Sequence, residues 1–351
     1  MVKTFLITGA AGFIGSNFVR YWRGAHPEDR IVALDVLTYA GTLTSLSSVA
    51  DEITFIHGDI RDECLVERLL GEYDVTAVVN FAAESHNSYA ILAPVRFFEA
   101  NVMGPVALMN AIRKFGNNNI RFHQVSTCEV YGDMDLDDPG AFTELSPYRP
   151  HTPYNAAKAG GDHAVRAFGL TYGIPFTITI CANNYGPYQF PEKVIPLFVT
   201  NALLGKPLPV YESNRNRREW LHVDDHCRAI EAVLLRGRPG ESYHVGSGVE
   251  VDVATLASMI LAELGLGEDM KATVPDRPAH DRRYLLDSSK LRGELGWAPA
   301  IGFADGLENT IAWYRDNDCW WRPLLGRSPV VEETAWQTDI QPQDSREVAG
   351  A

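Results

Sequence analysis

The sequence has no long apolar run, few cysteines and a deficit of positive charge. No stretch of about 18 consecutive apolar residues is present, so the sequence offers no candidate transmembrane helix. The five cysteines are odd in number, scattered and without a CxxC pair, which argues against a disulfide framework and against a zinc site. We therefore expect neither structural disulfides nor a bound metal.

The charge balance excludes one class of partner. The chain carries 31 Lys and Arg against 45 Asp and Glu, a formal net charge of −14. Nonspecific binding of nucleic acid requires a basic surface, so we expect no nucleic-acid partner. A local basic pocket for a phosphorylated small molecule remains compatible with this charge. The first ten residues, MVKTFLITGA, lack the apolar core and cleavage site of a signal peptide, and we expect a cytoplasmic protein.

The remaining composition is that of an ordinary globular protein, with 46% apolar and 22% charged residues among 351. Strand-like and helix-like segments alternate along the first half of the chain. The predicted strands are residues 3–8, 30–35, 54–58, 77–81, 121–126 and 175–181, and the predicted helices are 15–23, 63–71, 95–115 and 154–172. This alternation predicts a parallel sheet that is covered by helices on both faces.

The pattern changes after about residue 186. Proline-rich stretches interrupt it, and the predicted helices are 226–235 and 253–264. We therefore expect a first domain over residues 1–186, a smaller lobe over 187–326 and a flexible polar tail over 327–351.

A glycine-rich turn follows the first predicted strand and opens the first predicted helix. Residues 8–15 read TGAAGFIG, which places Gly9, Gly12 and Gly15 in a variant of the dinucleotide-binding fingerprint. Asp35 ends the second predicted strand, where a carboxylate binds a ribose hydroxyl and repels a 2′-phosphate. The pattern therefore favours NAD over NADP. Asp59 follows the third strand, where it either meets the adenine amine or caps the next helix.

A tyrosine and a lysine four residues apart form the candidate catalytic pair. Tyr154 and Lys158 share one helix face, and a nearby ammonium lowers the pKa of a tyrosine from about 10. Upstream, the strand ending in VSTCEVYG places Thr127 where its hydroxyl can bond a substrate hydroxyl. Together with the glycine-rich turn, this set is typical of oxidoreductase chemistry at a hydroxyl group.

These residues resemble the extended short-chain dehydrogenases/reductases, and within them the dTDP-glucose 4,6-dehydratase family. The resemblance covers residues 2–322 and rests on segments that occur in the family's order: DVLTYAG (35–41), FAAESH (81–86), STCEVYG (126–132), SPYRPHTPYNAAKA (146–159), NNYGPYQFPEKVIPL (183–197), REWLHVDDHCRA (218–229) and DRPAHDRRYLLD (276–287). It implies a Rossmann-like, doubly wound parallel sheet with a smaller C-terminal α/β substrate lobe. It also implies NAD as cofactor, a nucleotide-diphosphate sugar as substrate and a homodimer.

The resemblance implies a reaction in three steps, from dTDP-glucose to dTDP-4-keto-6-deoxyglucose. Tyr154 takes the proton of the sugar 4-hydroxyl while hydride leaves C4 for NAD, Glu129 takes the C5 proton, and hydride returns to C6 after water has left. The family protonates the leaving hydroxyl with an Asp, and Cys128 stands at that place in this sequence. A thiol is mostly protonated at pH 7 and can donate a proton. The alternative is that Cys128 is an apolar filler and water protonates the leaving group.

Other outcomes stay open. Hydride returned to C4 would make the protein a nucleotide-sugar 5,6-dehydratase or a 4-epimerase, and a non-catalytic NAD-binding scaffold is a rival from another class. Two segments also depart from the family pattern. Residues 87–90 read NSYA where the family has V-D-R-S, and residues 211–214 read YESN where it has Y-G-D-G.

The resemblance assigns the remaining contacts residue by residue. The implied cofactor contacts are Gly9, Gly12, Phe13, Ile14, Gly15, Asp35, Asp59, Ile60, Phe81, Ala82, Ala83, Tyr154, Lys158 and Asn184. The implied substrate contacts are Ser85, His86, Asn183, Lys193, Val194, Pro209, Tyr211, Arg218, Arg277 and His280. Among the latter, the Arg and Lys side chains would pair with the diphosphate.

Overall fold

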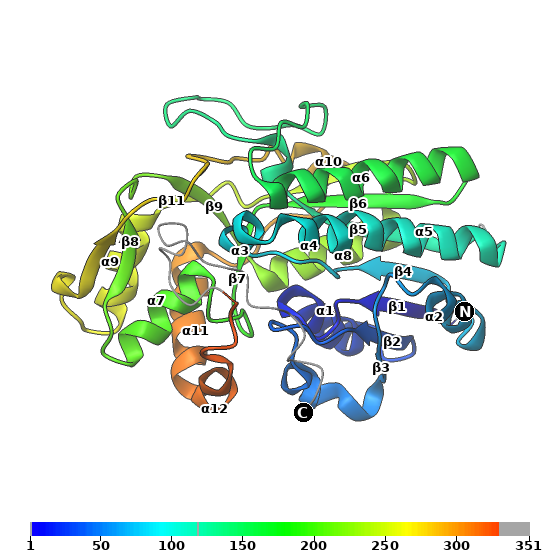
Figure 1. Ribbon diagram of the computed structural model, residues 1–351, viewed down its shortest axis with the longest axis horizontal. Helices are drawn as coiled ribbons and strands as arrows, with labels where there is room; N and C mark the ends of the chain where they lie inside the picture. The colour runs from blue at the N-terminus through cyan, green and yellow to red at the C-terminus, as the bar shows by residue number, and fades with distance from the viewer. Residues whose placement is uncertain (1, 118, 330–351) are drawn as a thin grey trace.

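A computed structural model describes residues 2–117 and 119–329, and its centre is a seven-stranded parallel sheet (Figure 1). The strand order is β10-β6-β5-β4-β1-β2-β3. The strands are β1 Thr4–Thr8, β2 Arg30–Asp35, β3 Thr54–His57, β4 Ala77–Asn80, β5 Arg121–Thr127, β6 Phe176–Cys181 and β10 Ser242–Val245. The chain builds outward from β1 to β3 and then returns to place β4 on the other side of β1, so the order reverses there. Ligands bind at such a reversal in open α/β sheets, outside the carboxyl ends of the strands.

Helices cover both faces of this sheet. On one face lie α2 Glu63–Glu72, α5 Gly104–Phe115 and α6 Pro153–Tyr172, and on the other lie α1 Phe13–Ala25 and α8 Val223–Arg236. Side chains alternate between the two faces along each strand. In β1, Leu6 joins the apolar cluster that contains α2 and α5, whereas Phe5 and Ile7 join the cluster that contains α1. The predicted doubly wound α/β fold is confirmed.

The predicted helix 95–115 is wrong as a single element. The structure divides it into α4 Pro94–Phe98, a π-helical turn η2 Glu99–Met103, and α5. The π-helical turn directs the buried Asn101 toward the loop after β4, where its side chain accepts from the Glu84 N–H and donates to the Glu84 carbonyl, both at 2.9 Å. The spacing of apolar residues in the sequence does not reveal a π-helical turn.

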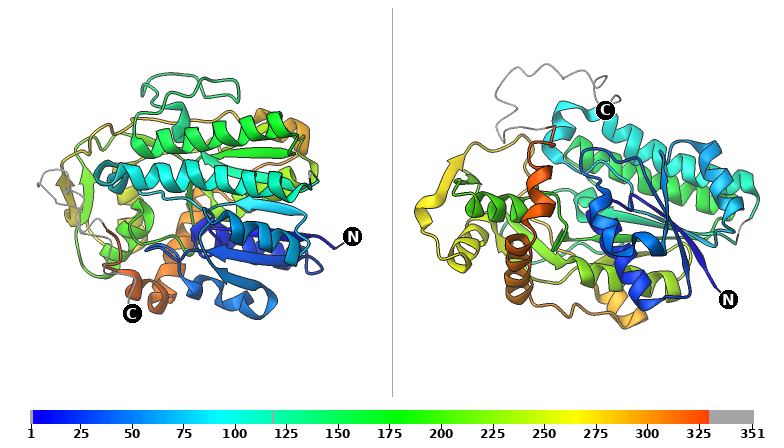
Figure 2. Two further views of the ribbon diagram at one scale, coloured as in Figure 1. Left: turned by 45° about the vertical axis from the view of Figure 1, so that its right-hand side comes forward. Right: turned by 90° about the horizontal axis from the view of Figure 1, so that it is seen from below.

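The second lobe lies beside the carboxyl ends of the strands (Figure 2). It contains a three-stranded sheet ordered β11-β9-β7 and a parallel pair of β8 with β12. The strands are β7 Asn183–Tyr185, β8 Leu208–Tyr211, β9 Arg217–His222, β11 Glu250–Asp252 and β12 Lys271–Val274, and the helices are α7 Val194–Leu203, α9 Val253–Glu263 and α11 Phe303–Asp316. Apolar side chains from these helices form a core separate from that of the first sheet, including Phe198, Ile260 and Ile311.

The chain returns to the first sheet after residue 186. Strand β10 pairs with β6 in parallel, and α8 packs on α1. The boundary at residue 186 therefore marks only one of the points where the chain passes between the two lobes. We retain it as a proposed division.

Several short elements complete the structure. They are α3 Asn87–Leu92, α10 Ser289–Leu295, α12 Asp318–Trp321 and the short 3-10 segments η1 Leu43–Glu52, η3 Cys128–Tyr131, η4 Glu268–Met270 and η5 Arg322–Leu324. None of the helices over residues 2–117 and 119–329 combines the length and apolar character needed to cross a membrane.

The predicted tail begins at residue 327, and residues 330–351 lie outside the described part. Within the part that is described, Arg327 donates to the Gly41 carbonyl at 3.4 Å, and the Ser328 hydroxyl donates to Glu192 at 2.9 Å. The start of the predicted tail is therefore held against the first domain and the loop before α7.

Candidate active site

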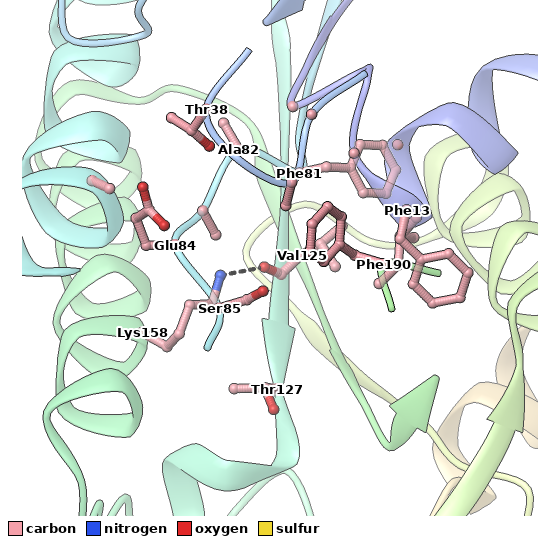
Figure 3. A pocket seen from close by; sticks show the side chains of 18 of the residues that line it. Phe13, Thr38, Phe81, Ala82, Glu84, Ser85, Val125, Thr127, Lys158 and Phe190 are labelled. Carbon is pink, nitrogen blue, oxygen red and sulfur yellow. Dashed lines mark hydrogen bonds between the residues drawn. The ribbon is translucent and has the colours of Figure 1, made fainter. Parts of the chain in front are cut away.

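A cavity of about 530 Å³ opens at the carboxyl edge of the parallel sheet (Figure 3). The turns after β1, β2, β4 and β5 line it, together with the start of α6 and the segment between β7 and α7. The sequence-predicted residues that line it are Gly9, Gly12, Phe13, Ile14, Gly15, Asp35, Asp59, Ile60, Phe81, Ala82, Ala83, Ser85, Thr127, Glu129, Tyr154, Lys158, Asn183, Asn184 and Lys193. The cavity thus brings together the predicted cofactor loop and most of the predicted catalytic set.

The turn after β1 leaves no room for side chains at two of its glycines. Gly9 has φ +63°, and a Cβ there would lie 2.5 Å from the Ala82 nitrogen. A Cβ on Gly15 would lie 2.2 Å from the Gly9 carbonyl oxygen. Gly12 is the N-cap of α1 and supplies no capping side chain, so the first N–H groups of the helix point toward the cavity uncapped. This arrangement fits a pyrophosphate, which needs close backbone approach and N–H donors.

Asp35 ends β2 with its carboxylate fixed by backbone donors. The Ala11 N–H reaches one oxygen at 2.9 Å and the Leu37 N–H reaches the other at 2.7 Å. Burial raises the pKa of Asp35, and these two bonds oppose that effect. The carboxylate therefore has a fixed place beside the glycine-rich turn, as the ribose-binding role requires.

The helix-cap alternative for Asp59 is wrong, because Asp62 is the N-cap of α2 and accepts from the Leu65 N–H. Asp59 instead lines the cavity and pairs with the Arg61 guanidinium at 2.6 Å. Burial opposes its ionisation, but Arg61 outweighs burial and lowers the pKa of Asp59. Arg61 also lines the cavity and was not predicted, although the segment HGDIRD that suggested Asp59 contains it.

The start of α6 positions the tyrosine and the lysine. Thr152 caps the helix by accepting from the Asn155 N–H at 3.2 Å, and Pro153 occupies the first helical position. Tyr154 and Lys158 are both buried and both line the cavity. The Lys158 ammonium donates to the Val125 carbonyl at 2.7 Å, the bond drawn in Figure 3.

The sequence predicts that Lys158 lowers the pKa of Tyr154, and the structure gives the opposite direction. Burial raises the pKa of Tyr154 well above its ordinary value, and the negative charge of Glu129 raises it further. The reason is that a buried phenolate loses its hydration, while Lys158 is engaged by the Val125 carbonyl. Burial also lowers the pKa of Lys158 itself.

Three consecutive residues at the end of β5 and the start of η3 lie in different surroundings. Thr127 and Glu129 line the cavity, and the Glu129 carboxylate accepts from the Asn87 side-chain amide at 2.9 Å. Cys128 is not among the lining residues, is 1% exposed and belongs to the main apolar core. Burial raises the pKa of Cys128 well above its ordinary value, so its thiol holds a proton at neutral pH.

Part of the predicted substrate set also borders the cavity. The Lys193 ammonium donates to the Ser85 carbonyl at 2.5 Å, and the Asn183 side-chain oxygen is buried without a hydrogen-bond partner among the described residues. His86 caps α3 through its ring nitrogen, and burial lowers its pKa to about 3. The neighbouring Glu192, which was not predicted, lies 3.6 Å from that ring and lines the cavity.

The rest of the predicted substrate residues lie beyond the cavity lining. They are His86, Val194, Pro209, Tyr211, Arg218, Arg277 and His280. The buried Arg218 donates to the carbonyls of Arg217, Asp281 and Arg282, and lies over the Tyr284 ring at 4.9 Å. The His280 ring meets the edge of Tyr211 at 4.9 Å. Apart from His86, which caps α3 in the first domain, these side chains lie in the second lobe, outside the cofactor cavity.

In the part of the chain that the structure describes, no group of three or more His, Cys, Asp or Glu side chains could hold a metal ion. A doubly wound sheet with a glycine-rich turn after β1, and with Thr127, Tyr154 and Lys158 around one cavity, defines an extended short-chain dehydrogenase/reductase. Glu129 beside this set adds a second base, which simple hydride transfer does not need.

Comparison with known proteins places the chain more closely. Residues 6–310 match the family model described as GDP-mannose 4,6 dehydratase. The dTDP-glucose 4,6-dehydratase of Streptomyces niveus is 49% identical over 325 residues, which cover 91% of this chain and 95% of that protein. The chain belongs to the dTDP-glucose 4,6-dehydratase family, as the sequence resemblance predicts.

Solved structures can be compared by both fold and sequence identity. DesIV, the dTDP-glucose 4,6-dehydratase of Streptomyces venezuelae, was solved with NAD bound and superposes with a TM-score of 0.88 at 48% identity, covering 92% of this chain and 99% of its own. The UDP-glucose 4-epimerase of Thermotoga maritima superposes with a TM-score of 0.82 at 26% identity, covering 89% and 99%. The fold is thus shared with epimerases, while the sequence is much closer to the dehydratases.

Proposed function

We propose that this chain is an NAD-dependent nucleotide-sugar 4,6-dehydratase that converts dTDP-glucose to dTDP-4-keto-6-deoxyglucose and water. The observation that carries the proposal is that Glu129 lines the same cavity as Tyr154 and Lys158. Oxidation and reduction at one carbon need only the tyrosine and lysine, whereas elimination across C5 and C6 needs a further base. The near full-length identity of 49% to a dTDP-glucose 4,6-dehydratase supports the same substrate.

NAD, when bound, supplies the acceptor and later the donor of the hydride. The glycine-rich turn and the uncapped start of α1 would hold its pyrophosphate, and the Asp35 carboxylate would hold the adenosine ribose. Because Asp35 already accepts two backbone N–H groups, its place is set before the cofactor arrives.

Tyr154 removes the proton from the sugar 4-hydroxyl, and Thr127 accepts or donates the hydrogen bond that orients that hydroxyl. The buried phenol holds its proton strongly in the protein alone, so its activation requires positive charge brought next to it. Lys158, one helical turn further on, supplies part of that charge and is itself held by the Val125 carbonyl.

Glu129 then removes the C5 proton, which the 4-ketone has made acidic. The C5–H electron pair moves to form the enolate, the C6–O bond breaks, and the departing hydroxyl takes a proton and leaves as water. We assign that proton to Cys128, which follows Thr127 directly and holds its thiol protonated through burial. Because the thiol lies outside the cavity lining, this role requires its side chain to turn from the apolar core toward the cavity when substrate binds. Glu129 returns its proton to C5 as C6 receives the hydride that bound NAD would supply, and the proton that Tyr154 took from the 4-hydroxyl restores the Cys128 thiol by way of solvent.

The nucleotide contacts are assigned to the second lobe. Arg277 has a buried Nε without a hydrogen-bond partner among residues 2–117 and 119–329, and the same holds for the side-chain oxygen of Asn183. Unpaired buried groups are costly, and a bound diphosphate sugar would satisfy both. Arg218 is expected to orient this region, since it ties three backbone carbonyls together beside His280.

We also infer a cytoplasmic homodimer. All five cysteines are free thiols, as is usual in a reducing compartment. Large apolar side chains are exposed along the helical segments α4, η2 and α6, among them Val95 at 68%, Met103 at 53% and Leu170 at 80%. A second copy would cover such side chains. Light scattering coupled to size-exclusion chromatography tests this, and a monomer mass at micromolar concentration would contradict it.

The decisive experiment follows the hydride. Substrate deuterated at C4 is incubated with the enzyme, and the product is analysed by mass spectrometry and NMR. A 4,6-dehydratase moves the label to C6, whereas a 5,6-dehydratase or a 4-epimerase returns it to C4, and a scaffold protein leaves the substrate unchanged. We expect the label at C6, and label retained at C4 would refute the proposed reaction.

A further inference from the structure

A continuous series of hydrogen bonds connects the start of α6 to the carboxylate of Glu129. The Asn155 N–H donates to the Thr152 hydroxyl at 3.2 Å, and that hydroxyl donates to the Asn87 side-chain oxygen at 3.0 Å. The Asn87 amide nitrogen then donates to Glu129 Oε2 at 2.9 Å. The series joins three segments that are distant in sequence: the start of α3, η3 after β5, and the N-cap of α6.

The chemistry of these groups fixes the direction of every bond in the series. An ionised carboxylate only accepts hydrogen bonds, so Asn87 must present its NH₂ group to Glu129. Its oxygen then faces Thr152, whose hydroxyl already accepts from the helix backbone and has one proton to give. All three donors therefore point toward Glu129, with the positive N-terminal end of α6 behind them.

The contact determines how Glu129 meets the substrate. The bond to Asn87 engages Oε2, so Oε1 is the oxygen left to take a proton within the cavity. Asn87 is held in turn, because it is the first residue of α3, whose N-cap is the buried His86. The carboxylate is thus fixed at one oxygen by a donor that is itself anchored.

This donor belongs to a segment where the sequence departs from its family. The pattern V-D-R-S of the family is Asn87, Ser88, Tyr89 and Ala90 here, so an amide stands where the family has an apolar side chain. The other departure at the site, Cys128, is the residue directly before Glu129. Both departures therefore border on the same carboxylate.

We propose that Asn87 is a positioning residue for the elimination step, which orients Glu129 Oε1 toward C5 through its bond to Oε2. The proposal rests on the proposed function. In the step concerned, Glu129 gains the C5 proton, the C5–H electrons pass into the enolate, and the C6–O bond then breaks as the hydroxyl receives its proton. Asn87 neither gains nor loses a proton or an electron pair in this step. It affects only the orientation and the charge of the Glu129 carboxylate.

The test is a single-turnover experiment on the full-length holoenzyme with dTDP-glucose, followed by NADH absorbance. The rise reports oxidation at C4, and the decay reports elimination and hydride return. Asn87→Val restores the family residue and removes the donor. We expect the rise to stay within about twofold of wild type and the decay to slow by about 10- to 100-fold, the cost typical of a misplaced reacting group.

Further variants separate positioning from folding. Asn87→Asp keeps the size and the bond from Thr152 but turns a carboxylate toward Glu129, so the decay should slow at least as much. Thr152→Ser keeps the hydroxyl and should retain the wild-type decay, while Tyr89→Phe, in the same segment, is the matched control. Substrate deuterated at C5 gives a further readout: the isotope effect on the decay should increase in Asn87→Val, which loss of folded protein would not cause.

The outcomes are distinct. If wild type returns the C4 label to C4, the proposed function fails, whatever Asn87 does. If wild type moves the label to C6 and Asn87→Val decays at the wild-type rate, Asn87 has no positioning role. A parallel fall of rise and decay with an unchanged isotope effect would also overturn the inference, because it would mark a general structural role.

Discussion

At the scale of single residues, burial decides what the side chains of the site can do. Glu129 and Cys128 are adjacent in sequence, yet one faces the cavity and the other lies in the apolar core. Tyr154 is buried enough that its pKa rises rather than falls. Spacing identified Tyr154, and the family resemblance implied roles for Cys128 and Glu129, but the direction of the Tyr154 pKa shift depends on burial and on neighbours from other segments. Spacing alone could not give it.

The charge of Asp35 should set the cofactor preference. Asp35→Asn keeps an oxygen for one of the two backbone N–H donors but removes the negative charge that repels a 2′-phosphate. We expect the ratio of NAD to NADP affinity to fall about tenfold or more, which corresponds to about 1.4 kcal/mol. Titration of both cofactors against wild type and variant measures this ratio. An unchanged ratio would remove Asp35 from the ribose site.

The thiol of Cys128, although it lies in the apolar core beside the cavity, should supply the proton for the leaving hydroxyl once substrate is bound. Cys128→Ala is expected to slow NADH decay in a single turnover by about 10²- to 10⁴-fold, the range of a lost general acid, with little change in the rise. Cys128→Asp introduces the carboxylic acid that the sequence resemblance implies at this position and should keep or raise the decay rate. Wild-type decay in Cys128→Ala would instead identify water as the proton donor and Cys128 as a filler.

At the scale of elements, local signals predicted α6 correctly, whereas the packing of α6 on η2 explains why the single helix predicted over residues 95–115 is wrong. The predicted helix 154–172 matches α6 closely, because its apolar spacing and its Thr-Pro start are local signals. The π-helical turn in η2 depends on contact with α6, where Gly161 approaches the Asn101 carbonyl. The short strands β7 to β9 likewise depend on partners far along the chain, so no local pattern marked them.

This packing gives a testable difference between two neighbouring glycines of α6. A Cβ on Gly161 would lie 2.2 Å from the Asn101 carbonyl oxygen, whereas a Cβ on Gly160 would meet only the end of the Val102 side chain at 2.9 Å. We expect Gly161→Ala to lower the free energy of unfolding by about 1–3 kcal/mol, as overpacking does. Gly160→Ala should change it by less than about 1 kcal/mol, since alanine favours helix. Urea unfolding of both variants makes the comparison, and equal losses would contradict it.

At the scale of the whole molecule, buried histidines make the fold sensitive to acid. Burial lowers the pKa of His226 to about 3 and that of His244 to about 4, from 6.5, and it lowers the pKa of His123 well below its ordinary value. Such groups bind protons in the unfolded chain first, so the stability that they contribute is complete above about pH 6.5 and is lost as pH falls toward the folded values. Glu219, whose pKa burial raises to about 7, acts in the opposite direction.

A single substitution isolates one of these histidines. His226→Gln keeps a donor for the Asn184 side-chain oxygen, which the His226 ring contacts at 2.9 Å, but cannot titrate. Between about pH 6 and 4, the slope of unfolding free energy against pH should fall by about 1.4 kcal/mol per pH unit relative to wild type, the effect of one proton. Urea titrations across this range measure both slopes. Parallel slopes would show that His226 does not titrate with unfolding.

The position of β10 beside β6 has a consequence for how the protein is made. A ribosome synthesises β6 well before β10, so the nascent chain carries β6 as an open sheet edge while the intervening second-lobe strands emerge. An open edge of apolar residues invites pairing with other chains. Biosynthesis therefore passes through a stage that is prone to aggregation. A chain stopped at residue 186 would remain at that stage, and we expect it to collect in inclusion bodies and to bind chaperones.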